Sequence, residues 1–424
     1  MGKLSHLIPQ DVFRYFEEIT EIPHGSGDME RISDFCLEFA KRNGKEAGKD
    51  LDMFNFARAN MIRAFGDKWW DAFFTINSAR IKQWGFNTVA VNINNYQDEN
   101  VWEFVDKLKL PFTYAIPDYP MTKKMVFRDF PDVFSPEYEA NAKVYAEQVR
   151  RFKDNPYLIG YFMTNEPEWS VVKGVNLAEI QLTADNDLYS RQQLIKFLQD
   201  RYETIEKLNE CWESDFVSFG ELKKININEN AKKDLDEFNV IIITKYVQVP
   251  TDAIKAVDGN HMNLGNRYAG MPGYGYCSAD GQYDVFSENA YRREPDEFYD
   301  TLAKTFDKPM IMGEWMFGGS DRSHFSNALI NATNQYERGK ACANYMQLAM
   351  AHKHCVGIHY FELNDEPVLG TYDGQSMPHG FVNVCNMPYT KCVNEFVGIA
   401  EKMYEYIDGE IEPEKIEWEY RIRF

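Results

Sequence analysis

The sequence predicts an α/β fold of the (β/α)8 TIM-barrel class. From about Gln83 onward, short β-branched or aromatic runs alternate with longer amphipathic patterns, which is typical of βαβ units. Polar residues gather where the predicted strands end, and barrels of this class have their functional side chains at those carboxyl ends. An open, doubly wound sheet is the alternative fold, but no G-x-G-x-x-G pattern follows the first predicted strand.

The first strand of a complete barrel should precede the helix predicted at Asp67–Phe86, but two helical patterns and a charged link, NGKEAGKD, stand there instead. Seven strands follow, one fewer than a complete barrel has. The amphipathic stretches between them are long enough for helices that cover a parallel sheet. The strands are expected at Asn87–Asn94, Phe112–Asp118, Leu158–Asn165, Met262–Tyr268, Asp284–Asn289, Pro309–Glu314 and Gly357–Leu363.

Three regions are expected along the chain. A helical N-terminal segment spans residues 1–50, and the barrel spans residues 51–410 with a helical insertion at about 170–261. A C-terminal tail spans residues 411–424. A barrel without its first strand exposes two sheet edges, so either the N-terminal segment fills the gap or the barrel is poorly stable.

Composition and charge exclude several classes of protein. Hydrophobic residues make up 44% of the chain and aromatic residues 15%, which is enough for a large core and excludes a disordered chain. The net charge is −20, from 66 acidic and 46 basic residues, and it would repel nucleic acid and anionic membranes. An acidic surface is compatible with a neutral substrate, although its commonest meaning is solubility.

The cysteine pattern and the first residues bear on the compartment. The seven cysteines are scattered and form no C-x-x-C pair, which indicates buried thiols in a reducing compartment. The opening MGKLSHLIPQ lacks the apolar core of a signal peptide, and no apolar run approaches the ~18 residues of a membrane span. We therefore expect a cytoplasmic protein with no membrane partner. The oligomeric state is not indicated by these patterns.

Two glutamates end predicted strands and are the strongest candidates for chemistry. Glu166 follows the run LIGYFMTN, and Glu314 ends the run KPMIMGE. Two carboxyl groups facing one barrel mouth suit glycoside hydrolysis, in which one protonates the leaving oxygen and the other attacks the anomeric carbon or activates water. Capping of the helices that follow is the alternative role. Glu168 competes with Glu166, but Pro167 breaks the strand between them and favours Glu166.

Several motifs in order resemble a known family. TNEPEW followed far downstream by GEW is similar to the retaining (β/α)8 glycoside hydrolases whose acid/base follows an asparagine on strand four and whose nucleophile ends strand seven. The resemblance is nearest to the β-agarases, with kinship to the bacterial β-galactosidases, and covers about residues 54–405. It also rests on FARANMIRAFG, IKQWGFNTVAVN, NPYLIGYFMTNEPEW, KLNECWESDFVSF, GNHMNLGNRYAG, DVFSENAYR, KPMIMGEWMFGGSDR and GIHYFELNDEPVLG.

The resemblance implies a reaction and the roles of four residues. It implies that Glu166 is the acid/base, that Asn165 binds the sugar 2-hydroxyl, that Glu314 is the nucleophile and that Tyr291 hydrogen-bonds the nucleophile. The substrate would be a β-linked galactose-containing glycan, either agarose-like or a β-galactoside, cleaved with retention through a glycosyl-enzyme intermediate. The alternative is a catalytically impaired, truncated barrel that only binds carbohydrate.

Further side chains near the strand ends are candidates for substrate binding, each with a plainer alternative. Asn266 and Arg267 end a strand and could reach sugar hydroxyls, while Arg267 could equally pair with an acidic residue. Aromatic faces at strand ends can stack on sugars or pack in the core. The aromatic candidates are Trp169, Trp315 and Tyr360, the last standing where relatives often have tryptophan.

Other polar residues are given lesser roles. His324 could contact substrate, or it could be a solvated or capping loop histidine. Glu362, Asp365 and Glu366 are expected to be solvated loop charges or ligand contacts rather than catalysts. We expect no metal and no cofactor, because the histidine pair of HKHC would point to different faces of a helix.

The N-terminal segment resembles a different family. Ile8–Gly44, IPQDVFRYFEEITEIPHGSGDMERISDFCLEFAKRNG, is similar to the start of the Xaa-His dipeptidases, whose metal-binding residues come later in their chains. No counterpart of that later part follows here, so His24 is expected to be a loop residue and peptidase activity is not implied. The juxtaposition indicates a fusion.

Overall fold

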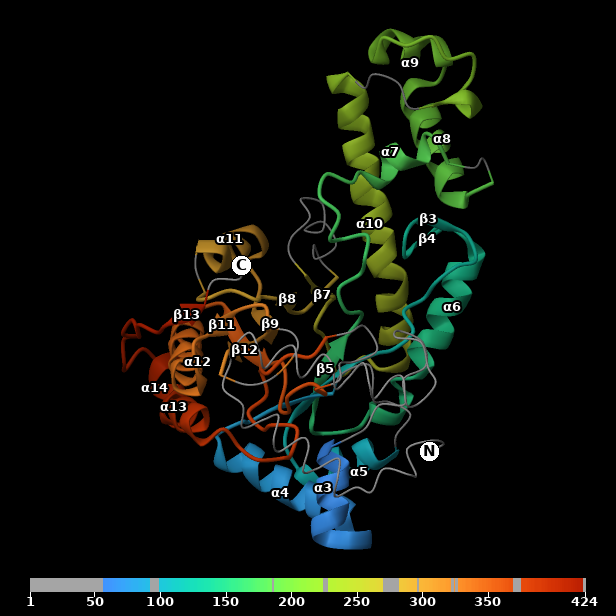
Figure 1. The fold of residues 1–424 in the computed structure, drawn as a ribbon. Coiled ribbons are helices and arrows are strands. Elements are labelled where there is room, and N and C mark those ends of the chain that lie inside the picture. Colours follow the sequence, from blue (N-terminus) through green and yellow to red (C-terminus); the bar gives the residue numbers. More distant parts are fainter. Residues whose placement is uncertain are drawn as a thin grey trace, which may run out of the picture. The chain divides into compact units, whose positions relative to one another are not determined.

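The computed structural model (Figure 1) describes residues 56–91, 99–184, 187–223, 228–269, 282–295, 297–321, 324, 327–368 and 375–421. The predicted N-terminal segment therefore lies outside the described residues. The chain divides into two compact units. Unit 1 comprises Met1–Asn87, Tyr291–Asp296 and Glu314–Phe424, and unit 2 comprises Thr88–Ala290 and Glu297–Gly313.

Unit 2 is built on parallel strands that follow one another in chain order. One sheet has the order β1 (Val89–Val91), β2 (Phe112–Ala115), β5 (Leu158–Phe162) and β6 (Met262–Asn263). A second series holds β7 (Arg267–Tyr268), β8 (Phe286–Asn289) and β9 (Met310–Trp315), and the chain passes into unit 1 within β9. The pairs β1–β2, β2–β5, β5–β6 and β7–β8 are parallel, as βαβ units require.

The strand predicted at Met262–Tyr268 is interrupted in its middle. Its two parts are β6 and β7, and Gly265 between them has a φ of +74°, a left-handed conformation that favours glycine. The pairing nevertheless continues, because Met163 N donates to Gly265 O at 2.9 Å and Arg267 N donates to Thr164 O at 2.9 Å. The hydrogen-bonded series of strands therefore runs on from β5 through β7 to β8.

The strands of unit 2 curve around a common apolar interior. Ala115, Phe162, Leu264, Val285 and Ile311 form one buried cluster, and they come from or adjoin β2, β5, the β6–β7 strand, β8 and β9 in turn. Side chains from so many successive strands meet only if the sheet bends toward them, as it does in a barrel. Full burial of one of the larger side chains in this cluster contributes roughly 1.5–3 kcal/mol to the free energy of folding.

Helices connect the strands of unit 2. They include α5 (Glu99–Leu108), α6 (Pro136–Glu147) and α11 (Glu297–Phe306), with a short 3-10 turn, η3 (Arg150–Phe152), after α6. The start of α6 is fixed by its sequence, since Ser135 Oγ accepts a hydrogen bond from Tyr138 N at 3.1 Å and Pro136 occupies the first helical position. A hairpin of β3 (Met125–Phe127) and β4 (Phe130–Pro131) lies in the connection after β2.

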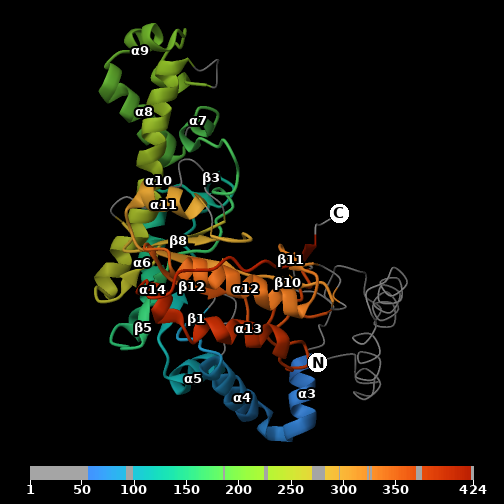
Figure 2. The ribbon, with the colours of Figure 1, turned by 90° about the vertical axis from the view of Figure 1, so that its left-hand side faces the viewer.

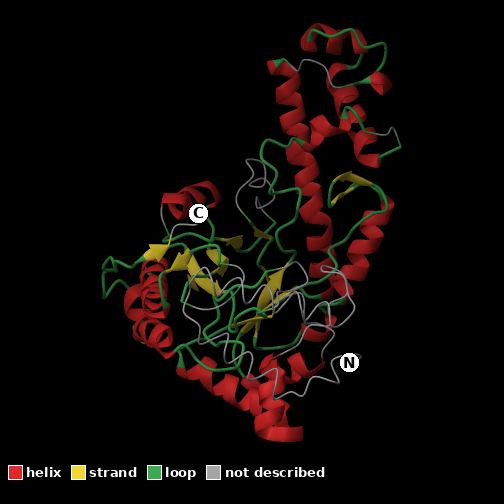
Figure 3. Cartoon of the chain, in the orientation of Figure 1, coloured by secondary structure: helices red, strands yellow, loops and turns green. Residues whose placement is uncertain are grey.

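The stretch between β5 and β6 is a helical excursion. Figure 3 shows its described residues as helices joined by loops, and in Figures 1 and 2 the long helix α10 runs beside α6. Its packing follows from buried apolar residues along α10, among them Leu235, Phe238 and Ile242. The elements are α7 (Leu177–Gln181), α8 (Tyr189–Tyr202), α9 (Ile205–Trp212), η4 (Phe219–Glu221) and α10 (Glu229–Val257).

Among the helices that the structure describes, none is both long enough and apolar enough to cross a bilayer.

The described part of unit 1 begins with helices, and its last strand belongs to a small sheet. The helices α3 (Phe56–Phe65) and α4 (Trp69–Gln83), separated by η1 (Gly66–Lys68), agree with the helical patterns predicted there. They are followed by β10 (Gly318–Gly319), β11 (Asn331–Ala332), α12 (Gln335–Met350), β12 (Cys355–Tyr360), α13 (Thr390–Ala400), α14 (Met403–Ile407) and β13 (Tyr420–Arg421). In Figure 2, α12 and α13 run side by side.

Side chains on α4 and after it attach the first helices to the rest of unit 1. Arg80 donates to Asn386 Oδ1 and to Asn386 O, both at 2.9 Å. Phe86 packs on Phe396 with ring centroids 4.7 Å apart. The last predicted strand, β12, adjoins the end of β9, because Phe361 N donates to Trp315 O at 3.0 Å.

A C-terminal strap, residues 414–421, crosses unit 1. Its strand β13 pairs antiparallel with β11. Trp418 packs edge-on against Phe317 with ring centroids 5.3 Å apart. The strap is also bound to α12, where Ile416 N donates to Asn344 Oδ1 at 2.9 Å and Glu419 N donates to Glu337 Oε2 at 2.8 Å.

All seven predicted strands are present within the described residues, although residues 92–94 of the first lie outside them. Residues 56–83, directly before that strand, are helical apart from the turn at η1. Within the described ranges, β1 is accordingly the terminal strand of its sheet.

Candidate active site

Glu166 stands just beyond the carboxyl end of β5. Asn165 forms a parallel bridge with Arg267, and Glu166 N donates to Arg267 O at 2.8 Å. The carboxyl group is therefore attached to a backbone that the neighbouring strand holds, at the rim position that the sequence predicts. Glu168, the competing glutamate, is exposed and lies beyond the buried Pro167.

Asn289 is a site residue that sequence reasoning missed. It is the last residue of β8, and its side-chain Nδ2 donates to Glu166 Oε1 at 2.7 Å and to Asn165 Oδ1 at 3.1 Å. One amide thus orients both residues of the Asn165-Glu166 pair. A signal was present, because Asn289 is the final residue of the strand predicted at Asp284–Asn289 and is as polar as the other strand ends.

Gly313 leaves the space that this arrangement needs. A Cβ atom at Gly313 would lie 2.7 Å from Asn289 Oδ1, 2.9 Å from Arg267 Cδ and 2.9 Å from Ser287 Oγ. Contacts that short do not occur, so a larger residue would displace the amide that contacts Glu166. The glycine in KPMIMGEW is therefore explained by the side chains beside it.

Asn266 and Arg267 are buried and engaged with the protein. Asn266 Nδ2 donates to the Tyr268 hydroxyl at 3.0 Å. Arg267 is 2% exposed, its Nη1 donates to Gly313 O at 3.3 Å, and its guanidinium lies 5.5 Å from the centre of the Phe162 ring. These contacts give both residues a supporting role within unit 2.

Trp169 is placed in the core of unit 2. Its side chain is 3% exposed and meets the rings of Phe130 and Tyr246 edge-on, at centroid distances of 5.3 and 5.4 Å. Core packing, the alternative stated for this tryptophan, describes what the structure has. A strand-end aromatic is thus available for stacking only if its ring turns outward, which the sequence does not specify.

In unit 1, Glu314 is bound by a tyrosine. Glu314 is the fifth residue of β9 and is buried, and the Tyr291 hydroxyl donates a hydrogen bond to its Oε2. This is the contact that the resemblance implies for these two residues. The hydrogen bond orients the carboxyl group and stabilises its negative charge.

Trp315 and Tyr360 pack against each other. Trp315 is 1% exposed, stacks on Tyr345 at 4.6 Å with an interplanar angle of 7°, and meets Tyr360 edge-on at 4.8 Å. The Tyr360 hydroxyl donates to His379 O at 2.6 Å. Both side chains therefore pack around the end of β9, and core packing describes the buried Trp315 better than sugar stacking does.

Three carboxyl groups follow β12, and two of them differ from one of the alternatives expected for them, that of solvated charges. Asp365 and Glu366 are buried, so their interpretation as solvated loop charges is wrong. Glu366 Oε2 accepts a hydrogen bond from Met377 N at 2.7 Å, and Asp365 Oδ1 accepts one from Gly380 N at 2.7 Å. Backbone N–H donors satisfy these carboxylates, which bind the loop after β12 to residues 377–380.

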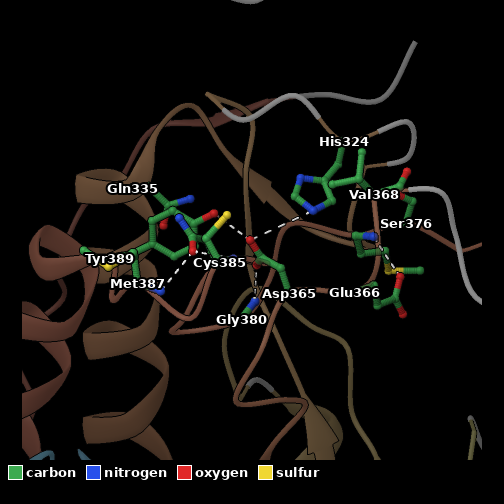
Figure 4. Close-up of polar contacts among 12 residues, drawn as sticks. His324, Gln335, Asp365, Glu366, Val368, Ser376, Gly380, Cys385, Met387 and Tyr389 are labelled. Atoms are coloured by element: carbon green, nitrogen blue, oxygen red, sulfur yellow. Dashed lines mark hydrogen bonds and ion pairs between the residues drawn. The ribbon is translucent and has the colours of Figure 1, made fainter. Parts of the chain in front are cut away.

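Asp365 is the centre of the contacts drawn in Figure 4. Its Oδ2 accepts from the Tyr389 hydroxyl at 2.5 Å and lies 4.0 Å from His324 Nε2. His324 is thereby held beside the β12 loop within unit 1. Gly380 is required there, because a Cβ atom on it would lie 2.1 Å from Asn364 C and from Asp365 N.

Glu362 differs from its two neighbours. Its side chain is exposed, yet partial desolvation and the nearby charges of Glu366, Glu314 and Asp365 raise the pKa of its carboxyl to about 7. The desolvation is the largest cause, and the charges of the other carboxylates act in the same direction. Glu362 therefore changes its charge near neutral pH.

The two candidate glutamates have the same kind of side-chain contact, each within its own unit. Each is a carboxyl at a strand end that accepts a hydrogen bond from a neutral donor, Asn289 for Glu166 and Tyr291 for Glu314. The two donors are two residues apart in the sequence. Within the described ranges, no group of three or more histidine, cysteine, aspartate or glutamate side chains is arranged to hold a metal ion.

Comparison with known families places the chain among glycoside hydrolases. Residues 121–361 match the model of glycoside hydrolase family 42, described as Beta-galactosidase. Beta-agarase B of Vibrio sp. (strain JT0107) is 27% identical over 380 residues, which cover 84% of this chain and 39% of that protein. The chain thus spans about two fifths of the length of this curated relative.

Solved structures show the same architecture. The crystal structure of an agarase superposes with a TM-score of 0.74 at 26% identity, covering 82% of this chain and 52% of that one. A β-galactosidase from the Antarctic haloarchaeon Halorubrum lacusprofundi superposes with a TM-score of 0.56 at 15% identity, covering 80% and 57%. The fold is that of a TIM barrel, which confirms the predicted fold class.

Proposed function

The chain belongs to the beta-galactosidase family of glycoside hydrolases, and from this membership we propose that it is a retaining enzyme for β-linked galactose-containing glycans. The observation that supports the proposal most directly is the matched pair of strand-end glutamates, each with its own neutral donor. The agarase relatives favour an agarose-like substrate, and the family favours a β-galactoside.

In the proposed mechanism, Glu314 is the nucleophile and Glu166 is the acid/base. Glu314 attacks the anomeric carbon while Glu166 protonates the departing glycosidic oxygen, and water then hydrolyses the glycosyl-enzyme with Glu166 as base. Tyr291 holds the nucleophile in one orientation, and Asn289 does the same for the acid. Asn165, directly before the acid, is left to bind the sugar 2-hydroxyl through the remaining capacity of its amide.

Binding of carbohydrate without turnover is the second candidate function. The observation in its favour is that, within the described ranges, the strand series begins at β1 and residues 56–83 before it are helical apart from the turn at η1. A barrel with an open side loses part of the support for its interior, and precise placement of two carboxyl groups depends on that support.

Hydrolysis assays with matched variants test the proposal. We expect the protein to release aryl alcohol from aryl β-galactosides or to cleave agaro-oligosaccharides, with the β-anomer formed first. Glu166→Gln and Glu314→Gln should each lower kcat/KM for an unactivated substrate by roughly 10²–10⁴-fold or more, because each removes a group that acts in the transition state. Glu168→Gln, two residues from the acid, is the control and should keep near-normal activity.

Two results would contradict this function. Activity that survives both Glu166→Gln and Glu314→Gln would exclude these residues as the catalytic pair. If NMR shows that the α-anomer is the first product released, retention is excluded. Binding of agaro-oligosaccharides without cleavage, in a folded wild-type protein, would favour the second candidate.

A further inference from the structure

Glu166 has an unusual backbone conformation for a residue with a side chain. Its φ is +44°, in the left-handed region that favours glycine. A side-chain-bearing residue stays in such a conformation only where the surrounding contacts hold it. One such contact is the bond from Glu166 N to Arg267 O, which holds the chain on the amino-terminal side of the residue.

The contact on the other side comes from Asp129. This residue lies at the tip of the β3–β4 hairpin, between Met125–Phe127 and Phe130–Pro131. Its Oδ2 accepts a hydrogen bond from Glu168 N at 2.7 Å, and its Oδ1 accepts one from Trp169 N at 2.8 Å. A single carboxylate thus binds two successive N–H groups directly after the candidate acid.

The same turn is closed by two further contacts. Ser170 N donates to Pro167 O at 2.9 Å, so residues 167–170 form a tight turn after Glu166. The Trp169 ring packs edge-on against Phe130, the residue that follows Asp129. The hairpin tip therefore contacts this turn through both polar and apolar groups, although 39 residues separate Asp129 from Glu168 in the sequence.

We propose that Asp129 is a positioning residue for the acid/base Glu166, acting through the N–H groups of Glu168 and Trp169. The inference rests on the proposed function for its effect on catalysis. Asp129 binds the backbone after Glu166, and Arg267 O binds the N–H group of Glu166 itself. With its backbone held at both points, the left-handed Glu166 directs its carboxyl group to Asn289. Loss of the Asp129 carboxylate lets the turn relax and moves the acid away from Asn289.

This role predicts a defect that depends on the leaving group. A substrate with a poor leaving group needs protonation of the departing oxygen, whereas a dinitrophenyl galactoside does not. We expect Asp129→Ala to lower kcat/KM for phenyl β-galactoside by roughly 10–100-fold, and for 2,4-dinitrophenyl β-galactoside by less than about threefold. A general loss of structure would lower both rates equally.

Two variants complete the series. Asp129→Asn keeps one oxygen that can accept a hydrogen bond and should give an intermediate ratio of the two rates. Asp252→Ala, on the exposed side of α10, is the matched control and should leave the ratio unchanged. Thermal unfolding of each variant verifies that the protein compared is folded.

Amide hydrogen exchange gives a readout that needs no turnover. In Asp129→Ala, the amides of Glu168 and Trp169 should exchange at least about tenfold faster than in the wild type, because backbone N–H groups without acceptors lose protection. The inference is overturned if these two amides keep their protection in Asp129→Ala. It is also overturned if an active Asp129→Ala variant shows an equal fall in kcat/KM for both galactosides. If the wild type hydrolyses no glycoside, the proposed function fails, and exchange alone decides whether Asp129 holds the turn.

Discussion

Three carboxyl groups within five residues of one another illustrate how the surroundings decide the behaviour of a side chain. Asp365 and Glu366 each accept backbone N–H donors, which stabilise their charged forms inside the protein. At Glu362, desolvation first and then the charges of Glu366, Glu314 and Asp365 raise the pKa of the carboxyl to about 7. Carboxyl groups therefore serve as structural anchors at two positions and as a titrating group at the third.

The titration of Glu362 predicts how stability changes with pH. The pKa of Glu362 is raised in the folded protein above the usual ~4.3 of a glutamate, so between about pH 4.3 and pH 7 the folded state keeps a proton that the unfolded state releases. Stability from this group is present below pH ~4.3 and is lost as the pH rises through about 7. Glu362→Gln has no carboxyl group at this position, so its stability should not fall in this way as the pH rises through about 7.

The measurement is the unfolding temperature of wild type and Glu362→Gln at pH 5 and pH 8. The variant should gain on the wild type at the higher pH, modestly, because Glu362 keeps contact with water. Glu168→Gln, an exposed glutamate outside the cluster, is the control. An equal difference at both pH values would contradict the prediction.

The placement of single residues was predictable from the sequence where it depends on their position along a strand. Glu166 and Glu314 end buried runs, and strand ends meet at one edge of a parallel sheet. Asn289 ends a run too, but an asparagine there signals chemistry less strongly than a carboxylate does. Trp169 and Trp315 could not be assigned, because the direction in which a strand-end ring turns depends on neighbours such as Tyr246 and Tyr345 that are distant in the sequence.

At the scale of elements, one buried carboxylate connects helices of the helical excursion. Asp234 on α10 accepts from the Tyr202 hydroxyl at 2.6 Å and from Trp212 Nε1 at 2.8 Å, and it also pairs with Arg201. These donors come from α8 and α9, so a single side chain connects three helices.

Removing this connection should loosen the excursion while the strands of unit 2 remain intact. Asp234→Ala leaves three donors without their acceptor, which costs about 2–5 kcal/mol of unfolding free energy. Asp200→Ala on α8 removes an exposed pair with Lys196 and should cost at most about 0.5 kcal/mol. Limited proteolysis followed by mass spectrometry should detect faster cleavage within residues 187–223 in Asp234→Ala alone, and equal cleavage in both variants would contradict the prediction.

Element types were predictable from periodicity, whereas their interruptions were not. The alternation of apolar runs and amphipathic stretches is strong enough to place seven strands, since a sheet covered by helices buries both faces. The division of Met262–Tyr268 into β6 and β7 depends on the left-handed Gly265, and a glycine inside a run does not reveal which conformation it adopts. The Asp129 contact to the turn after Glu166 likewise joins elements that no local pattern connects.

At the scale of the whole molecule, the charge imbalance predicts a response to salt. A net charge of −20 opposes the compact state through self-repulsion, and added ions screen it over a Debye length of about 10 Å at 0.1 M. Raising sodium chloride from about 0.02 M to about 0.5 M should therefore increase the unfolding temperature. If screening adds ~1 kcal/mol to the free energy of unfolding, the increase is a few degrees.

Potassium chloride at equal ionic strength serves as the control for this effect, because screening depends on ionic strength and not on the identity of the cation. A fall in unfolding temperature with salt, or a rise with sodium chloride alone, would show that repulsion among the acidic residues does not limit stability.

The barrel class was predictable at this scale because it needs only the order and type of elements. The lengths of α3 and α4 and their attachment through Arg80 and Asn386 were not predictable, since those two residues are 306 positions apart.

The C-terminal strap has a consequence for how the protein is made. Asn344 and Glu337 on α12 receive their strap partners only after 72 and 82 further residues have been translated. Unit 1, which contains Glu314, therefore cannot be completed until synthesis has reached Tyr420. A premature stop codon a few positions upstream, or a bulky affinity tag joined directly to β13, would remove or disturb these strap contacts and so destabilise unit 1, which bears the candidate nucleophile.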